Sequence, residues 1–161
     1  MDYRTRKNFD STDRAVFRAL DDDPRIPVLL LAKKLGLARA TIQTRLERKM
    51  VGHHLLPHST RITPDSLGLP ISALVTAEVE QTSLDAAVAA LVGIPEIIEV
   101  HGIAGEADLA IRVVARDAED LFRLGQAITD CTGIRRTTTS LLLKSLIPLR
   151  ISQLLEEDAL A

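Results

Sequence analysis

The sequence predicts an α+β chain of two small domains, a helical one followed by one in which strands and helices alternate. Three observations predict this: helical spacing of apolar residues over roughly the first fifty positions, strand-like alternation further on, and a change of charge between the halves. Residues 1–63 carry 13 Lys and Arg against 7 Asp and Glu, a net charge of +6, whereas residues 64–161 carry a net charge of −8. This asymmetry indicates that contact with a polyanion is confined to the first half.

The bulk composition limits the classes of protein to consider. A length of 161 residues suits one ordinary domain or two small ones, and the 46% of hydrophobic residues are mainly aliphatic because aromatic residues make up only 2%. Two small interiors are marginal and gain from oligomerisation. The single cysteine, Cys131, excludes an intramolecular disulfide and a cysteine-cluster metal site. Because no apolar signal core or membrane-length apolar run occurs, we expect a cytoplasmic protein without a membrane partner.

Three short helices are predicted in the first half, at residues 9–23, 28–37 and 38–49. Asp10 is suited to cap the first, with Asp13 in the position of a capping box. Gly36 supplies the stop of the second. Three such helices with a glycine turn before the third are typical of a helix-turn-helix.

The third predicted helix has the composition of a DNA-recognition helix. Its non-core side is rich in Arg, Thr and Gln, which reach phosphates and base edges in a major groove about as wide as one helix. The alternative is a small helical subdomain with a solvated polar face, and the basic charge of this half favours DNA. The candidate DNA-binding residues are Arg39, Thr41, Gln43, Thr44, Arg45, Arg48 and Lys49. For Arg45, an ion pair within the domain is an equally good interpretation.

Helical periodicity ends near Val51, and the stretch that follows is turn-rich. We interpret it as a two-stranded wing, which would make residues 1–62 a winged helix-turn-helix domain. Residues 63–70 are then a linker. The histidines of this stretch, His53, His54 and His58, lack a nearby Cys or acidic ligand and are interpreted as polar loop residues rather than a metal site.

The second half, residues 71–161, is predicted to be a ferredoxin-like βαββαβ domain. Gly93 and Gly133 end its two helices. A short helix is expected after Pro148. The predicted strands are 71–80, 97–104, 109–115 and 135–147, and the predicted helices are 83–93 and 117–133.

A βαββαβ domain serves several functions, so its residues must distinguish them. Its predicted strands contain no Phe, Tyr or Trp, and an RNA-binding sheet needs such side chains to stack bases. His101 lies near acidic residues, but no nucleophile, base and orienting group are assembled by local spacing. The sequence therefore predicts no catalytic residue, no metal and no cofactor.

The most distinctive feature of the second half is the turn formed by Gly105, Glu106, Ala107 and Asp108. Glycine permits a tight conformation, and two carboxylates beside backbone N–H groups can hold the ammonium and carboxylate of an amino acid. An ordinary β-turn with solvated acids fits the spacing alone rather better.

Five segments together resemble the Lrp/AsnC family, the leucine-responsive or feast/famine regulators, from Phe9 to about Leu149. They are FDSTDRAVFRAL, RIPVLLLAKKLGLARATIQTRL, ITPDSLGLP, GEADLAIRV and GIRRTTTSLLLKSLIP, in that order. The resemblance implies a sequence-specific DNA-binding transcriptional regulator whose sheet pairs into homodimers, which often assemble further into octamers. It also implies that an amino acid or related metabolite binds near the glycine-acid turn, where Gly105 and Asp108 match the family motif.

Several residues depart from the family pattern. Glu106 and Ala107 replace an acid and an aromatic residue at the turn, and Pro27 and Ala38 stand where capping side chains are usual. Lys49, Met50 and His53 replace the usual residues that lead into the wing. Two alternative functions follow: an effector-sensing or assembly protein without DNA binding, and a tetrapyrrole enzyme similar to siroheme decarboxylases. The chain lacks the aromatic-rich segment that such enzymes carry at this turn.

Overall fold

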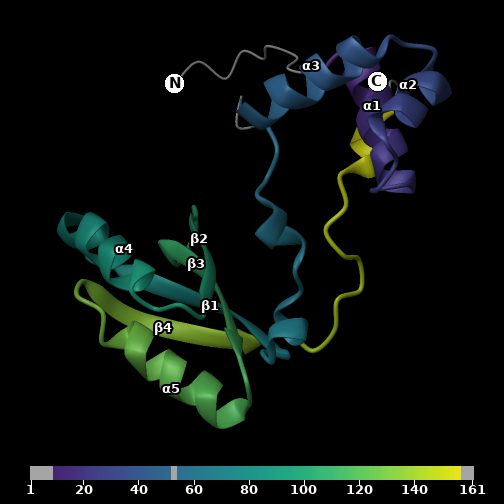
Figure 1. Cartoon of the computed structure of the whole chain (residues 1–161). Helices are drawn as coiled ribbons and strands as arrows, with labels where there is room; N and C mark the ends of the chain where they lie inside the picture. Colours follow the sequence, from purple (N-terminus) through teal and green to yellow (C-terminus); the bar gives the residue numbers. More distant parts are fainter. Residues whose placement is uncertain (1–8, 52–53, 157–161) are drawn as a thin grey trace. The chain divides into compact units, whose positions relative to one another are not determined.

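The computed structural model describes residues 9–51 and 54–156, which fall into two compact units (Figure 1). Unit 1 consists of the described residues up to 58 together with 147–156, and unit 2 consists of residues 59–146. This division differs from the expected one at both ends of the second domain. Residues 59–70 group with the sheet, and residues 147–156, expected in the second domain, group with the helices of the first.

Unit 1 contains the three helices that the sequence predicts. They are α1 (Ser11–Asp22), α2 (Val28–Leu35) and α3 (Arg39–Val51). Asp10 caps α1 in a complete capping box with Asp13, and Gly36 ends α2 with φ of 65°, a conformation that favours glycine. Pro27, at the N-cap of α2, makes no side-chain capping hydrogen bond. The helices share a small core in which Val16, Leu31 and Ile42 are fully buried.

The expected two-stranded wing is not found among the described residues of the 51–63 stretch. Residues 58–61 form the 3-10 helix η1 (His58–Arg61), which is followed by η2 (Pro64–Leu67) and by Gly68 at φ 80°. The apolar residues here do not alternate with polar ones, and Pro57 has no N–H to donate to a strand ladder. The described residues of the region expected to form a hairpin therefore contain 3-10 turns and no strand.

Unit 2 has the predicted βαββαβ order. Its elements are β1 (Ile71–Val79), η3 (Gln81–Ser83), α4 (Leu84–Val92), β2 (Ile97–Gly102), β3 (Leu109–Ala115), α5 (Ala118–Thr129) and β4 (Ile134–Leu141). The strands form one antiparallel sheet in the order β2-β3-β1-β4, which places β1 and β3 at its centre. The sequence prediction of a ferredoxin-like second domain is confirmed.

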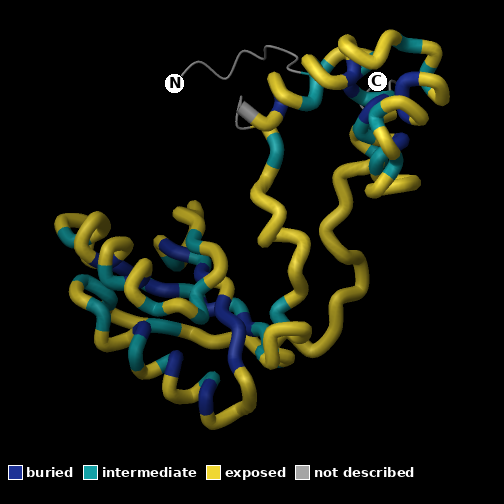
Figure 2. Tube along the Cα trace, viewed as in Figure 1, coloured by how far each residue is buried: buried dark blue, intermediate teal, exposed yellow. Residues whose placement is uncertain are grey.

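The core of unit 2 lies between one face of the sheet and its two helices. Along β1, alternate residues are buried, and they pack with β3 and with Ala87 and Leu91 of α4 and Ile128 of α5 (Figure 2). The intervening residues of β1, such as Leu74 and Thr76, point to the opposite face and remain half-buried. This alternation is the signature of a sheet covered on one side only.

Residues 142–150 are exposed throughout and lead from β4 back to unit 1. Where a helix was predicted after Pro148, the described residues, which end at 156, contain one 3-10 turn, η4 (Ser152–Leu155). No helix in the described ranges is both long enough and apolar enough to cross a bilayer.

Candidate nucleic-acid interface

Helix α3 divides into a buried side and an exposed polar side. Ile42 is fully buried and Leu46 packs against the same core, which fixes the rotation of the helix about its axis. Five of the seven candidate DNA-binding side chains lie on the exposed side: Arg39, Thr41, Gln43, Thr44 and Arg48. Thr41, Thr44 and Arg48 follow one another at spacings of three and four residues, so they form one stripe along the helix. The amide nitrogen of Gln43 lies 3.3 Å from a carboxylate oxygen of Glu47.

Arg45 is held inside unit 1 rather than presented to solvent with the other five. Its Nη1 donates to Oδ2 of Asp10 and to Oδ1 of Asp13, both at 2.7 Å, and only 28% of its side chain is exposed. The sequence left open whether Arg45 binds DNA or forms an ion pair within the domain, and the structure shows the ion pair. Arg45 therefore joins the recognition helix to the start of α1.

Lys49 is the candidate that the structure removes from the exposed set. Its Nζ lies 2.9 Å from Oδ2 of Asp13 and 4.4 Å from the centroid of the Phe9 ring, a cation–π contact. The residue is only 6% exposed. Because the ammonium is enclosed by these partners, Lys49 is not exposed with the five residues above, and a role of Lys49 in DNA binding stays a prediction.

The α1–α3 cluster consists of Asp10, Asp13, Arg45 and Lys49, and it has a definite protonation state. The hydrogen bond from Arg45 holds the pKa of Asp10 below its ordinary value. Burial alone would raise the pKa of Asp13, but hydrogen bonds from Arg45 and Lys49 outweigh it and hold the pKa low. Both carboxylates therefore stay ionised and each cation keeps its partner.

Only part of this cluster is predictable from the sequence. The spacing of Asp10 and Asp13 indicates a capping box, but their second role as anchors for α3 depends on residues 32 to 36 positions later. A signal is present in the spacing of Arg45 and Lys49. They lie one helical turn apart and therefore face the same way.

The glycine-acid turn lies between β2 and β3 in unit 2. Gly105 has φ of 152° with no atom within 4 Å of an added Cβ, and Glu106 is exposed. Asp108 is tied to the sheet: one of its carboxylate oxygens accepts a 2.7 Å hydrogen bond from the N–H of Val79, and its own N–H donates to Ala77. The four candidate residues are thus adjacent, with one oxygen of Asp108 already used by the backbone.

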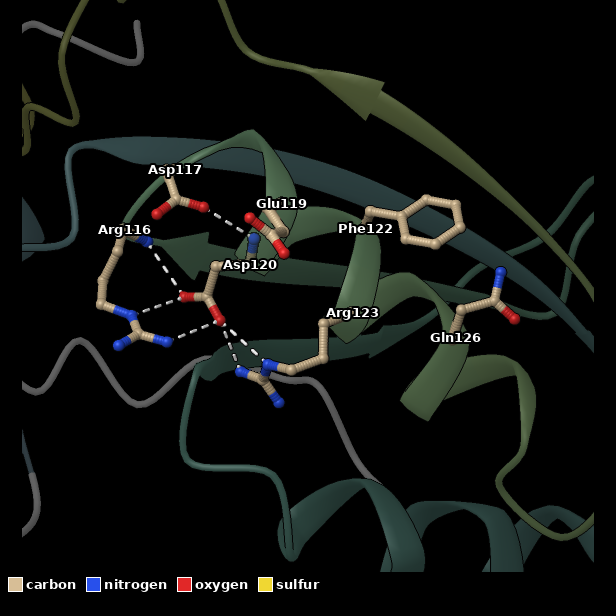
Figure 3. Close-up of a pocket in the computed structure, with 7 residues that line it drawn as sticks. All are labelled: Arg116, Asp117, Glu119, Asp120, Phe122, Arg123 and Gln126. Carbon is tan, nitrogen blue, oxygen red and sulfur yellow. Dashed lines mark hydrogen bonds and ion pairs between the residues drawn. The ribbon is translucent and has the colours of Figure 1, made fainter.

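A groove of about 550 Å³ lies at the start of α5, and the sequence analysis did not predict it (Figure 3). Asp120 is at its centre and accepts hydrogen bonds from the backbone and side chain of Arg116 and from the side chain of Arg123. Arg123 also reaches Glu96 at 2.8 Å. We call Glu96, Arg116, Asp120 and Arg123 the α5 cluster.

The charged side chains of the α5 cluster form ion pairs with one another. Hydrogen bonds from the side chain and backbone of Arg116, then from Arg123, hold the pKa of Asp120 far below its usual range. Asp117 is occupied as the N-cap of α5, accepting from the Asp120 N–H at 2.8 Å. The carboxylates of Asp117 and Asp120 in this groove therefore already have partners within the chain.

No other grouping of chemistry-bearing side chains stands out in the described ranges. His101 is exposed, 4.0 Å from Glu99, which is itself paired with Arg112. The described His, Cys, Asp and Glu residues include no group of three or more placed to hold a metal ion. His53 lies outside the described residues, and His54 stacks edge-on against Phe9.

Two family matches cover most of the chain. Residues 9–48 match the AsnC-type helix-turn-helix domain, and residues 72–151 match the Lrp/AsnC ligand binding domain. The first match contains all of α2 and most of α3, and the second contains nearly the whole sheet of unit 2.

Similar proteins and structures agree with these matches. The chain is 30% identical to the proline dehydrogenase transcriptional activator of Rhizobium radiobacter, over 86% of this chain and 91% of that protein. The structure of E. coli AsnC superimposes with a TM-score of 0.81 at 24% identity, covering 89% of this chain and 98% of the other. The feast or famine regulatory protein from M. tuberculosis, solved with L-methionine, has a TM-score of 0.77 at 29% identity, with 88% and 97% coverage. With both domains matched in order, this chain belongs to the Lrp/AsnC family of transcriptional regulators.

Proposed function

We propose that this chain regulates transcription by placing the exposed side of α3 in the major groove of double-stranded DNA. The observation that carries the proposal is the separation of roles on this helix. Arg45 and Lys49 are held inside the unit, while Arg39, Thr41, Gln43, Thr44 and Arg48 are exposed on the solvent side. Arg39 and Arg48 are suited to phosphates, and the three uncharged side chains are suited to base edges.

The test of DNA binding is a measurement of affinity against salt concentration, on fragments selected from genomic DNA. For Arg39→Ala/Arg48→Ala we expect weaker binding and a shallower dependence on salt, by about 0.9 in the log–log slope for each phosphate that the variant no longer neutralises. Arg135→Ala/Arg136→Ala in β4 of unit 2 makes the same change of charge and should leave the slope unaltered. If the α3 variant binds like the parent chain, the proposed interface is wrong.

Base reading is tested separately from phosphate contact. Replacing Thr41, Gln43 and Thr44 with Ala should reduce the preference for selected DNA over random DNA, by about 1–3 kcal/mol for each base that the variant no longer reads. Non-specific binding and its salt slope should be retained, because no charge changes. A variant that keeps its full preference would place sequence reading elsewhere.

We further propose that unit 2 binds an amino acid or related small metabolite at residues 105–108. This is supported by the match to the family's ligand binding domain and by the neighbouring structure that was solved with L-methionine. In this chain Glu106 is exposed and can face an ammonium group, and Asp108 retains one carboxylate oxygen that is not hydrogen-bonded to Val79. Calorimetric titration with the twenty amino acids tests this site. Glu106→Gln should weaken binding of any hit at least tenfold, and an unchanged affinity would exclude this turn.

Assembly is part of the same proposal. The half-buried face of β1, opposite the helices, is suited to pairing with a second copy, and a dimer would present two α3 helices to successive major grooves of a roughly palindromic site. Dimers would then assemble further, up to an octamer. Native mass spectrometry with and without the amino acid tests both steps, and a chain that is monomeric at all concentrations would refute them.

A further inference from the structure

The segment of residues 147–156, which we call the returning segment, packs on the first helix of the DNA-binding unit. Its 3-10 turn η4 lies against α1, as the yellow ribbon beside α1 shows in Figure 1. The chain therefore leaves unit 1 before residue 59 and re-enters it after residue 146. Unit 1 is built from two stretches of sequence separated by the whole of unit 2.

Two arginines of α1 hold the returning segment by its backbone. Arg14 donates through Nη1 to the carbonyl oxygens of Leu154, at 2.8 Å, and Glu156, at 3.2 Å. Arg18 donates through Nη2 to the carbonyl oxygen of Leu155 at 2.8 Å. Arg14 and Arg18 are four residues apart and so share one face of α1. The carbonyls at the end of a short helical turn have no partner within it, and cations are the favoured partners there.

The space between α1 and the returning segment is lined mainly by apolar side chains. A groove of about 390 Å³ runs between α1, the residues after α3, and the returning segment. Its apolar lining comes from both sides: Phe9, Phe17 and Leu55 on one, and Ile151, Leu154 and Leu155 on the other. Two of the three phenylalanines of the chain lie here.

The attachment is local and small enough to depend on the two arginines. Residues 142–150 are exposed, so η4 is where the returning segment is fastened. Gln153 Oε1 is buried without a hydrogen-bond partner among the described residues, which costs free energy in the attached state. Among the described residues, the hydrogen bonds from Arg14 and Arg18 to the segment's backbone offset that cost.

Helix α1 links this attachment to the recognition helix. Asp13 of α1 binds both Arg45 and Lys49 of α3, so the orientation of α3 follows that of α1. Resting on the proposed DNA-binding function, we propose that Arg14 and Arg18 are positioning residues. They clamp the returning segment on α1 and thereby stabilise α1 and α3 in the arrangement that binds DNA, without contacting DNA themselves.

The first test needs no DNA and uses the full chain. Hydrogen–deuterium exchange is compared between the parent chain, Arg14→Ala/Arg18→Ala and the charge-matched control Arg135→Ala/Arg136→Ala. The clamp predicts at least tenfold faster exchange in α1 for Arg14→Ala/Arg18→Ala and not for the control, with β1 and β3 unchanged in both.

Leu155→Ser, which keeps both arginines, should accelerate the same amides. Arg14→Lys/Arg18→Lys should restore part of the protection, because lysine keeps the charge and one donor direction. Unchanged α1 exchange in both the double-alanine variant and Leu155→Ser would overturn the proposal.

The second test separates positioning from direct DNA contact. If the arginines act through α1, the double-alanine variant should bind DNA about tenfold more weakly with an unchanged salt slope. A slope shallower by about 0.9 per arginine, with normal α1 exchange, would make them phosphate ligands and overturn the proposal. A parent chain that binds no DNA would refute the proposed function, and the positioning role with it. Faster exchange in the variants would then still establish the clamp, so the two failures are distinguishable.

Discussion

The α1–α3 cluster and the α5 cluster are made of the same kinds of side chain but join very different parts of the chain. In unit 1, Asp10 and Asp13 bind cations that lie 32 and more positions away, on another helix. In unit 2, Asp120 binds arginines three and four positions away, and only the contact of Arg123 with Glu96 is long-range. The first cluster holds a tertiary arrangement, whereas the second mainly shapes the start of one helix. Removing a charged partner should therefore destabilise the fold more in the α1–α3 cluster than in the α5 cluster.

The largest effect is expected from Asp13→Ala. This change leaves Lys49 buried without an anion, and removal of one partner from a buried ion pair costs about 3–5 kcal/mol. We expect denaturant unfolding of the full chain to show a destabilised unit 1, and α3 amides to exchange faster. Asp13→Ala/Lys49→Met, which removes the unpaired charge as well, should recover part of the stability. If the double variant is no better than the single one, the cost lies in the capping box of α1 instead.

Acid should have an intermediate effect. Hydrogen bonds from Arg45 keep the pKa of Asp10 below its ordinary value of 3.8, and those from Arg45 and Lys49 outweigh burial to do the same for Asp13. Because the unfolded chain takes up these protons more readily, their stabilisation is fully present above about pH 4. It is lost as the pH falls through the lower values of the folded state.

NMR spectra recorded on lowering the pH will measure this effect. Asp10→Asn should flatten the acid dependence of unit 1 amides and leave that of unit 2 unaltered, because Asp120 has its own arginine partners. An acid response of unit 1 that is identical in the variant would mean that Asp10 does not contribute to it.

The smallest effect is expected from Arg123→Ala. Asp120 keeps the side chain and the N–H of Arg116, so its carboxylate is still paired. We expect a lower melting temperature than that of the parent chain, but a much smaller change than for Asp13→Ala, and no change in DNA binding. Differential scanning calorimetry of both variants gives the comparison. A decrease as large as that of Asp13→Ala would show that the link to Glu96 is a tertiary anchor after all.

What the sequence predicts correctly here is determined by neighbours in the chain. The capping box of Asp10, the stop at Gly36 and the alternation of β1 all depend on residues within a few positions, and each is found as predicted. The order βαββαβ follows from the same local patterns. The observed sheet order, β2-β3-β1-β4, belongs to a ferredoxin-like domain with that order of elements.

What the sequence does not predict depends on distant partners. Lysine is a residue type suited to binding DNA, and only the positions of Phe9 and Asp13 show that Lys49 is enclosed. The prediction of a two-stranded wing rests on the end of helical periodicity, which equally fits the observed turn at His58–Arg61. Likewise, no pattern near Pro148 indicates that the residues after it pack on a helix near the other end of the sequence.

The two-part construction of unit 1 also bears on the order of events during synthesis. Arg14 emerges 140 residues before Leu154, an interval of roughly 7 to 28 s at about 5–20 residues per second. The sheet can be completed once β4, which ends at Leu141, has been made, and at that point α1 still lacks the segment that packs on it. A nascent chain would thus be able to complete unit 2 before unit 1, so that a chain interrupted between the two lacks the segment that packs on α1.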